Sequence, residues 1–170
     1  NRVVRLDRGF RVRDTFQIVE DEDDVCHANC LEEADGELLL SIFTLTPGPR
    51  NEKNGTEPWR HEGKILRLDV SVIPDGPGPV WPYRALSPEG NPYRLDADPR
   101  ASLVWHRGLR NPWSYAFNAE TGAMAIADVG ESSWEEVDVT TLPDRNFGWP
   151  LFEGTAIYLT ECPGVDLSNL

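Results

Sequence analysis

Hydrophobic residues alternate with polar ones in several short stretches of the chain, and this pattern predicts β-strands. In residues 64–70, the side chains of Leu66, Leu68 and Val70 fall on one face and those of Arg67 and Asp69 on the other, as expected for a half-buried strand. Further strands are predicted at 38–44, 113–117, 123–127 and 134–139. The last three follow one another at roughly ten-residue spacing, which is typical of antiparallel strands in a sandwich, barrel or propeller blade. We therefore predict an all-β fold.

Composition and charge narrow the classes of function. The chain of 170 residues has 14 glycines and 14 prolines, in keeping with many turns, and its six Trp, six Phe and four Tyr argue against disorder. Its net charge of −13 argues against binding to nucleic acid or to anionic lipid, since both need a basic surface. The longest apolar run, residues 38–43, is far too short for a membrane span.

Several motifs occur in a fixed order between residues 62 and 154. They read GKILRLDV at 63–70, PY at 92–93, GLRNPW at 108–113, FNAETG at 117–122, ADVGE at 127–131, WEEVD at 134–138, NFGWP at 146–150 and FEG at 152–154. In this order and spacing they resemble the glucose/sorbosone dehydrogenase family, which includes quinoprotein soluble sugar dehydrogenases and hedgehog-interacting-protein-like proteins.

The resemblance implies a six-bladed β-propeller built from antiparallel four-stranded blades. A chain of 170 residues is too short to close such a ring alone, so we expect a fragment whose ring is completed by more polypeptide or by a larger assembly. Residues 1–170 then form one partial propeller domain. Its portion 1–61 diverges from the family, 62–154 resembles the family core, and 155–170 is a cysteine-containing connection.

The resemblance also implies cofactors. Active members of the family use pyrroloquinoline quinone (PQQ) and calcium: a histidine takes the hydroxyl proton of the sugar and a hydride passes to the quinone. Arg110 and Asn111 match the quinone-contacting Arg-Asn pair, and Gly130 and Glu131 fall where backbone carbonyls bind calcium. The alternative is structural: Arg110 packs on Trp113 and caps strand-end carbonyls, and Gly130 belongs to an ordinary loop.

His27 is the candidate catalytic base, but its surroundings depart from the family pattern. Where the family has two glycines after this histidine, the chain has Asn29 and Cys30, and the strand that follows lacks the Gly-Asp-Gly-Gly motif. We therefore expect His27 to lie away from the Arg110 face as a solvent-facing or structural residue. His61 and His106 match no catalytic position and are interpreted as surface or hydrogen-bonding residues.

The cysteines and one sequon bear on localisation. Cys26, Cys30 and Cys162 are candidates for disulfide bonds, and Asn54-Gly55-Thr56 is a glycosylation sequon. Together they favour a secreted or cell-surface protein. A zinc site at Cys26, His27 and Cys30 is disfavoured because a second ligand pair is missing from the motif.

Two functions follow. The first is an extracellular propeller with reduced or lost catalysis that binds a sugar or protein ligand, or acts as a structural module in a larger assembly. The alternative is an active sugar or alcohol dehydrogenase that depends on PQQ and calcium, with a histidine base and hydride transfer to the quinone. The sequence leaves open whether the chain belongs to an enzyme.

Overall fold

The computed structural model describes residues 2–6, 12–17, 27–34, 36–43, 61, 63–73 and 81–158. The regular structure in these ranges consists of β-strands and two short 3₁₀ helices, which confirms the all-β prediction. Cys26, Asn54 and Cys162 lie outside the described residues. No helix in the described part of the chain is long and apolar enough to cross a membrane.

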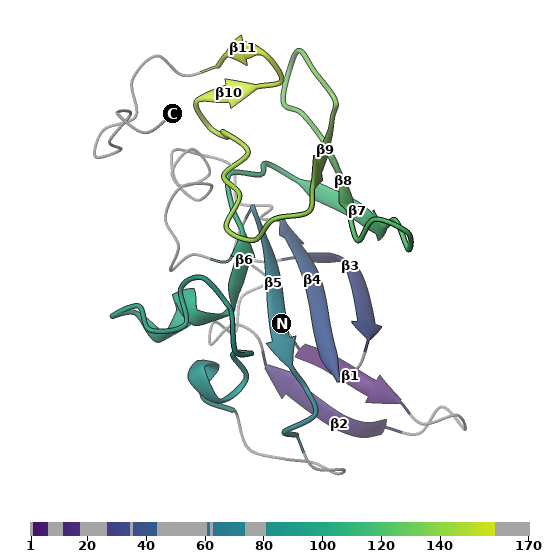
Figure 1. Ribbon diagram of the computed structural model, residues 1–170, viewed down its shortest axis with the longest axis vertical. Helices are drawn as coiled ribbons and strands as arrows, with labels where there is room; N and C mark the ends of the chain where they lie inside the picture. Colours follow the sequence, from purple (N-terminus) through teal and green to yellow (C-terminus); the bar gives the residue numbers. More distant parts are fainter. Residues whose placement is uncertain are drawn as a thin grey trace.

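The first sheet contains four antiparallel strands in the order β3-β4-β5-β6 (Figure 1). These are β3 His27–Ala34, β4 Glu37–Phe43, β5 Lys64–Asp69 and β6 Val104–His106. In β4 and β5 the predicted alternation places Leu38 opposite Leu68 and Leu40 opposite Leu66, and all four side chains are buried. Cross-strand aliphatic pairs of this kind stabilise the sheet and fix its register.

The second sheet contains three antiparallel strands in the order β7-β8-β9. These are β7 Pro112–Phe117, β8 Met124–Asp128 and β9 Glu136–Thr140, which confirms that the three predicted segments are consecutive strands of one sheet. Gly122 closes the turn between β7 and β8 with a positive φ of 70°, and its N–H donates to the carbonyl of Asn118 (2.8 Å). The predicted glycine turn is therefore confirmed.

The two sheets pack against each other through a second cluster of buried side chains, separate from the core of the first sheet. Leu109, Tyr115, Met124 and Ile126 pack with Ile65 of β5 in this cluster. The hydroxyl of Tyr115 also donates to the carbonyl of Leu39 in β4 (2.7 Å). One face of the second sheet is therefore used for packing on the first.

The remaining described elements are short. β1 Arg2–Leu6 pairs with β2 Val12–Gln17, and β10 Phe152–Glu153 pairs with β11 Ala156–Ile157. The long connection between β5 and β6 contains the 3₁₀ helices η1 Tyr83–Ala85 and η2 Pro99–Leu103. An isolated parallel bridge joins Arg107 to Asn146, so the chain that follows β9 returns to the end of β6.

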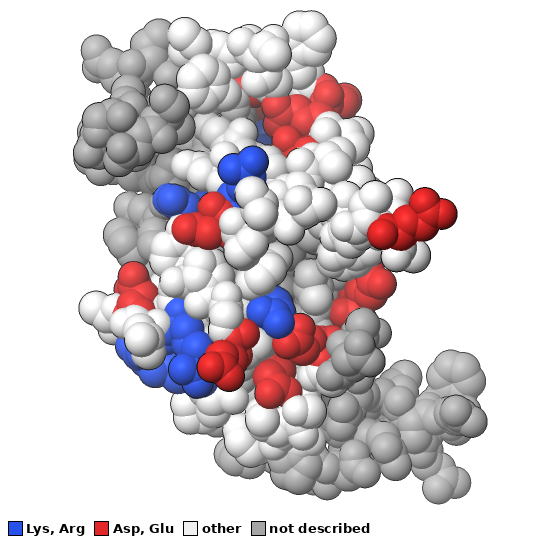
Figure 2. Space-filling model, in the orientation of Figure 1, with Lys and Arg blue, Asp and Glu red and all other residues white. Residues whose placement is uncertain are grey.

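Charge is unevenly distributed over the described surface. On the face shown in Figure 2, acidic side chains are scattered, and basic side chains form one larger group and several smaller ones. The exposed Arg84, Arg94 and Arg100 lie on or between η1 and η2. Arg100 is paired with Asp98, and Arg84 donates to the carbonyls of Arg94 and Asp96. These cations are therefore largely engaged within their own loop.

Candidate functional site

Asp128, at the end of β8, holds the turn that carries Arg110 and Asn111. Its carboxylate is buried and accepts from the backbone N–H of Arg110 (2.8 Å) and of Asn111 (2.6 Å). Burial raises the pKa of Asp128 to about 7, against the opposing effect of these two hydrogen bonds and with a further rise from nearby carboxylates. Asp128 therefore fixes the backbone of the turn rather than its side chains.

The guanidinium of Arg110 is engaged by its own chain. It forms an ion pair with Glu131, and Nη1 donates to the carbonyl of Val129 (3.1 Å). The guanidinium carbon lies 5.7 Å from the centre of the Trp149 ring, a distance typical of a cation–π contact. The side chain is only 16% exposed, and in the described part of the chain its Nε has no hydrogen-bond partner.

Asn111 links the two sheets. Its side-chain oxygen accepts from Nδ2 of Asn29 in β3 (2.8 Å), and the same Asn29 nitrogen lies 3.2 Å from the carbonyl of Pro112. Asn29 is one of the two residues that replace glycines of the family pattern. The sequence indicated what the substitution removes, but it held no signal for the contact that Asn29 makes, because 82 positions separate the partners.

The loop between β8 and β9 contains both predicted calcium residues. Gly130 lies so close to Trp134 that a Cβ atom would come within 1.7 Å of the Trp134 carbonyl oxygen, so this position requires glycine. The N–H of Gly130 donates to the carboxylate of Glu135 (3.1 Å). The side chain of Glu131 pairs with Arg110. Binding of calcium by the backbone carbonyls of Gly130 and Glu131 remains a prediction.

Glu153 in β10 caps this loop, a role that sequence reasoning missed. Its buried carboxylate accepts from the backbone N–H groups of Glu131 (2.5 Å), Ser132 (2.8 Å) and Ser133 (3.2 Å). Burial acts to raise the pKa of Glu153, but the hydrogen bonds outweigh it and hold the pKa below its ordinary value. The motif FEG was recognised as a family feature, but nothing in it identified the loop that its glutamate would reach.

The side chains present do not fit a quinone carboxylate in this arrangement. Such a ligand needs a guanidinium whose parallel N–H groups are directed at it, and those of Arg110 are directed at Glu131 and at the carbonyl of Val129. Asn111 is buried, and its oxygen is occupied by Asn29. The arrangement suits a structural role for both residues, namely fastening the β8–β9 loop and strand β3 to the start of β7.

The candidate base His27 is the first residue of β3, where it is opposite Phe43. Asn29, two positions further along, reaches Asn111, so this end of β3 lies beside the Arg110–Asn111 turn. The direction of the His27 side chain remains a prediction. Cys30 is a free thiol that packs against the cluster between the sheets. Its candidate partners Cys26 and Cys162 lie outside the described residues, so the disulfide bond stays a prediction.

The other two histidines are both buried, which corrects the expectation that they lie on the surface but confirms their hydrogen-bonding role. Nε2 of His61 lies 2.9 Å from the carbonyl of Arg100, and Nδ1 of His106 accepts from the N–H of Arg145 (3.3 Å). Burial lowers the pKa of each to about 4. Both imidazoles are therefore neutral and structural at pH 7.

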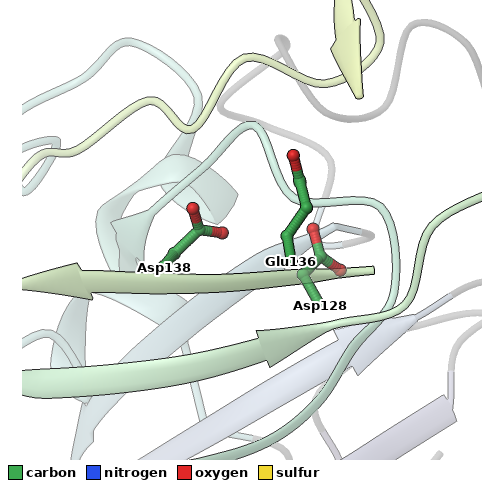
Figure 3. Close-up of side chains that lie close together, drawn as sticks. All are labelled: Asp128, Glu136 and Asp138. Carbon is green, nitrogen blue, oxygen red and sulfur yellow. The ribbon is translucent and has the colours of Figure 1, made fainter. Parts of the chain in front are cut away.

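Three carboxylates meet where β8 and β9 lie side by side (Figure 3). Asp128, Glu136 and Asp138 each offer an oxygen within 4.8 Å of the others. Burial and the neighbouring Glu136 raise the pKa of Asp138 to about 7, and burial also raises that of Glu136. The group can share protons or hold a cation, although both oxygens of Asp128 already accept backbone N–H groups. Sequence reasoning missed it because the grouping depends on the register that pairs Asp128 with Glu136.

The described structure also has an open groove of about 730 Å³ beside η1 and η2. Its lining comes from residues 82–84 and 97–100. Asp98 in this lining accepts from Nε and Nη2 of Arg100 (2.9 and 2.5 Å). Asp98 therefore compensates Arg100 within the groove, and none of the lining residues belongs to the Arg110 site.

Consecutive antiparallel sheets packed against each other define the class of a partial β-propeller. The family model described as "Glucose / Sorbosone dehydrogenase" matches residues 28–166. The chain belongs to this family.

Among curated proteins, the HIPL2 protein of Arabidopsis thaliana is 37% identical over 101 residues, which is 56% of this chain and 14% of that protein. The HIPL1 protein of the same plant is 36% identical over 112 residues, or 62% of this chain and 16% of that protein. The aldose sugar dehydrogenase YliI of Escherichia coli K12 is 31% identical over 91 residues, or 53% of this chain and 20% of that protein. The matches thus span at most a fifth of these relatives.

Among solved structures, the soluble aldose sugar dehydrogenase Asd of Escherichia coli, in its apo form, superposes with a TM-score of 0.59 at 19% identity. The match covers 87% of this chain and 39% of that chain. A structure described as glucose dehydrogenase gives a TM-score of 0.56 at 24% identity and covers 92% of this chain and 39% of that one. These likenesses confirm the propeller fold and show that the chain accounts for only part of it.

Proposed function

We propose that this chain is part of an extracellular propeller in which sugar dehydrogenase catalysis is reduced or lost, and that it acts as a binding or structural module. The observation that carries the proposal is the ion pair between Arg110 and Glu131. The guanidinium that the family resemblance aligns with a quinone carboxylate is neutralised by a carboxylate of its own chain. A ligand at this position would have to displace Glu131 before it could bind.

The contact between Asn29 and Asn111 supports the same proposal. Glycines at positions 29 and 30 would leave room beside the Arg-Asn turn, whereas Asn29 fills that place and joins β3 to the turn. The rest of β3 continues as an ordinary strand paired to β4. Asn29 and Cys30, which stand where the family pattern has glycines, therefore replace open space by contacts with the Arg-Asn turn and with the cluster between the sheets.

A secreted or cell-surface location is part of the proposal, with a sugar or protein ligand as the partner. Its support is the sequon at Asn54 and the candidate disulfide partners Cys26 and Cys162. We expect mass spectrometry of native protein to find glycan on Asn54 and at least one cysteine in a disulfide. Finding Asn54 unmodified and all three thiols free would contradict the location.

The alternative, an active dehydrogenase that uses PQQ and calcium, is favoured by one observation. Because Asn29 reaches Asn111, the end of β3 that carries His27 lies near the Arg110 turn. The sugar dehydrogenase among the relatives makes the same chemistry worth testing, with His27 as base and the carbonyls of Gly130 and Glu131 on calcium.

Calcium-dependent reduction of a dye, measured on native protein with added PQQ and a panel of aldoses, separates the two functions. We expect no turnover above that of a matched sample in which the protein is heat-denatured. Turnover that is abolished by His27→Ala but retained by Glu120→Gln, an exposed change on the β7–β8 turn, would establish the active dehydrogenase and refute the proposal.

A further inference from the structure

Two arginines in the loop between β5 and β6 carry a charge that no carboxylate in the described part of the chain balances by an ion pair. Arg84 donates from Nη1 and Nη2 to the carbonyls of Arg94 and Asp96, and Nε of Arg94 donates to the carbonyl of Ser87 (3.4 Å). The ion pairs of the described ranges involve other arginines. Because carbonyls hold a guanidinium in place without cancelling its charge, both side chains remain cationic.

These two charges are held near each other in a fixed arrangement. The guanidinium of Arg84 lies at the backbone of residues 94–96, and that of Arg94 lies at the carbonyl of Ser87, in the turn that follows Arg84. The larger basic group of Figure 2 lies on the side of the molecule where Figure 1 draws the two 3₁₀ helices of this loop. Like charges at short range repel each other, so an anion bound beside them is attracted by both. Its binding costs little side-chain entropy, because both arginines are already anchored.

Arg84 also lines the open groove beside η1 and η2, which forms the surroundings of these charges. Pro82 and Pro99 supply apolar surface to the lining, and Asp98 is paired with Arg100. Since the charges of that pair cancel, the charge left in the lining is that of Arg84. An open groove encloses little of a compact molecule, whereas an extended molecule can lie along it. The groove therefore suits a polymer that carries negative charges on an otherwise neutral chain.

We propose that this groove, together with Arg84 and Arg94, is a binding site for an acidic polysaccharide whose carboxylates contact the two guanidiniums. A guanidinium binds a carboxylate best through two parallel N–H groups. Within the described structure Arg94 donates only from Nε, so its two Nη groups are available for such a pair. Arg84 adds a second positive charge at the edge of the groove.

The walls of the groove argue against a peptide as the occupant. A peptide held as an added strand needs free backbone N–H and C=O groups on the wall. Pro82 and Pro99 have no N–H, and the N–H groups of Ala85 and Ala101 already donate to the carbonyls of Pro82 and Asp98. Nucleic acid needs a longer basic stripe, since it carries a phosphate at every step. A chain of acidic sugars offers carboxylates without either requirement.

Fluorescence anisotropy of a labelled oligogalacturonide with native protein tests the proposal, and the fully methyl-esterified oligomer is the matched probe. We expect the acid form to bind. The ester, which keeps the sugar chain but removes the charge, should bind at least about tenfold more weakly. This difference should shrink as salt rises from about 50 to about 500 mM, because exposed charges are screened. Equal binding of the two forms, or binding of neither, would overturn the proposal.

Substitutions place the binding on the two arginines. Arg84→Gln and Arg94→Gln should each weaken binding of the acid form about fivefold, which is the scale of an exposed charge pair. Arg145→Gln, which removes an exposed cation outside the groove lining, should change it less than about twofold, and equal losses in all three variants would contradict the site. A poly-glutamate peptide or a heparin fragment that binds more tightly than the oligogalacturonide would refute the assignment to polysaccharide carboxylates. None of these readouts involves Arg110, so they are independent of the function proposed above.

Discussion

Asp138→Asn should stabilise the protein at neutral and alkaline pH. Asp138 lies in β9 beside Glu136 and opposite Ile126, and within the described structure its Oδ2 atom is buried without a hydrogen-bond partner. Burial and the charge of Glu136 raise its pKa from 3.8 to about 7. The native state therefore holds a proton that the unfolded chain has already released between about pH 4 and 7.

The sign and size of the effect follow from this difference. Stability is fully present below about pH 4 and is lost as the pH rises through 7, because the carboxylate must then ionise in its unfavourable native position. A pKa rise of this size corresponds to about 4 kcal/mol for a fully buried group. Solvent screening at the partly exposed Asp138 reduces the expected gain from Asp138→Asn to about 1–2 kcal/mol at pH 8.

Urea unfolding at pH 5 and pH 8 measures the prediction. Asp138→Asn should gain stability over the wild-type protein at pH 8, and this gain should be smaller at pH 5. The buried His61 and His106, whose pKa values are lowered to about 4, act in the opposite direction in both proteins and cancel in this comparison. Glu120→Gln is the matched control, since it removes one exposed carboxylate outside the cluster. If Asp138→Asn lowers stability at pH 8, or leaves the pH dependence unchanged, the reasoning is wrong.

Four further substitutions test the scaffold by urea unfolding. Gly130→Ala should cost about 3 kcal/mol because the added Cβ would meet the Trp134 carbonyl. Gly122→Ala should cost only about 1 kcal/mol, because Gly122 has open space around it and only its φ of 70° is unfavourable for alanine. Equal losses of stability would contradict the close approach of Gly130 to Trp134. Glu153→Ala should cost about 2–4 kcal/mol because it leaves the N–H groups of the 131–133 loop unpaired, and a loss below 1 kcal/mol would count against the cap. Tyr115→Phe should cost about 0.5–1.5 kcal/mol through loss of the bond to Leu39, and a neutral result would show that this bond does not hold the sheets together.

The strands were predictable because their signals are local. Alternation in residues 64–70 and the glycine turn before β8 depend only on neighbouring positions, and both appear as predicted in the structure. Trp134 was included in a predicted strand, but β9 begins at Glu136, because the Trp134 backbone packs against Gly130 instead.

The contacts of the site were not predictable, because each depends on the relative placement of distant segments. Asn29 meets Asn111 across 82 positions. Arg110, which precedes β7, meets Glu131, which follows β8. The two residues that the family motif places side by side, Arg110 and Asn111, could be identified from the sequence. Whether they face a ligand or their own chain depends on Asn29 and Glu131, and only the fold brings those partners to them.

Calorimetric titration of native protein with PQQ in the presence of calcium tests the central claim that the ion pair with Glu131 keeps Arg110 from binding a ligand. The account predicts no saturable binding up to about 1 mM, and weak binding that emerges only with Glu131→Gln, which frees the guanidinium. Tight binding to the unmodified protein that falls by roughly 10- to 150-fold with Arg110→Ala would contradict it.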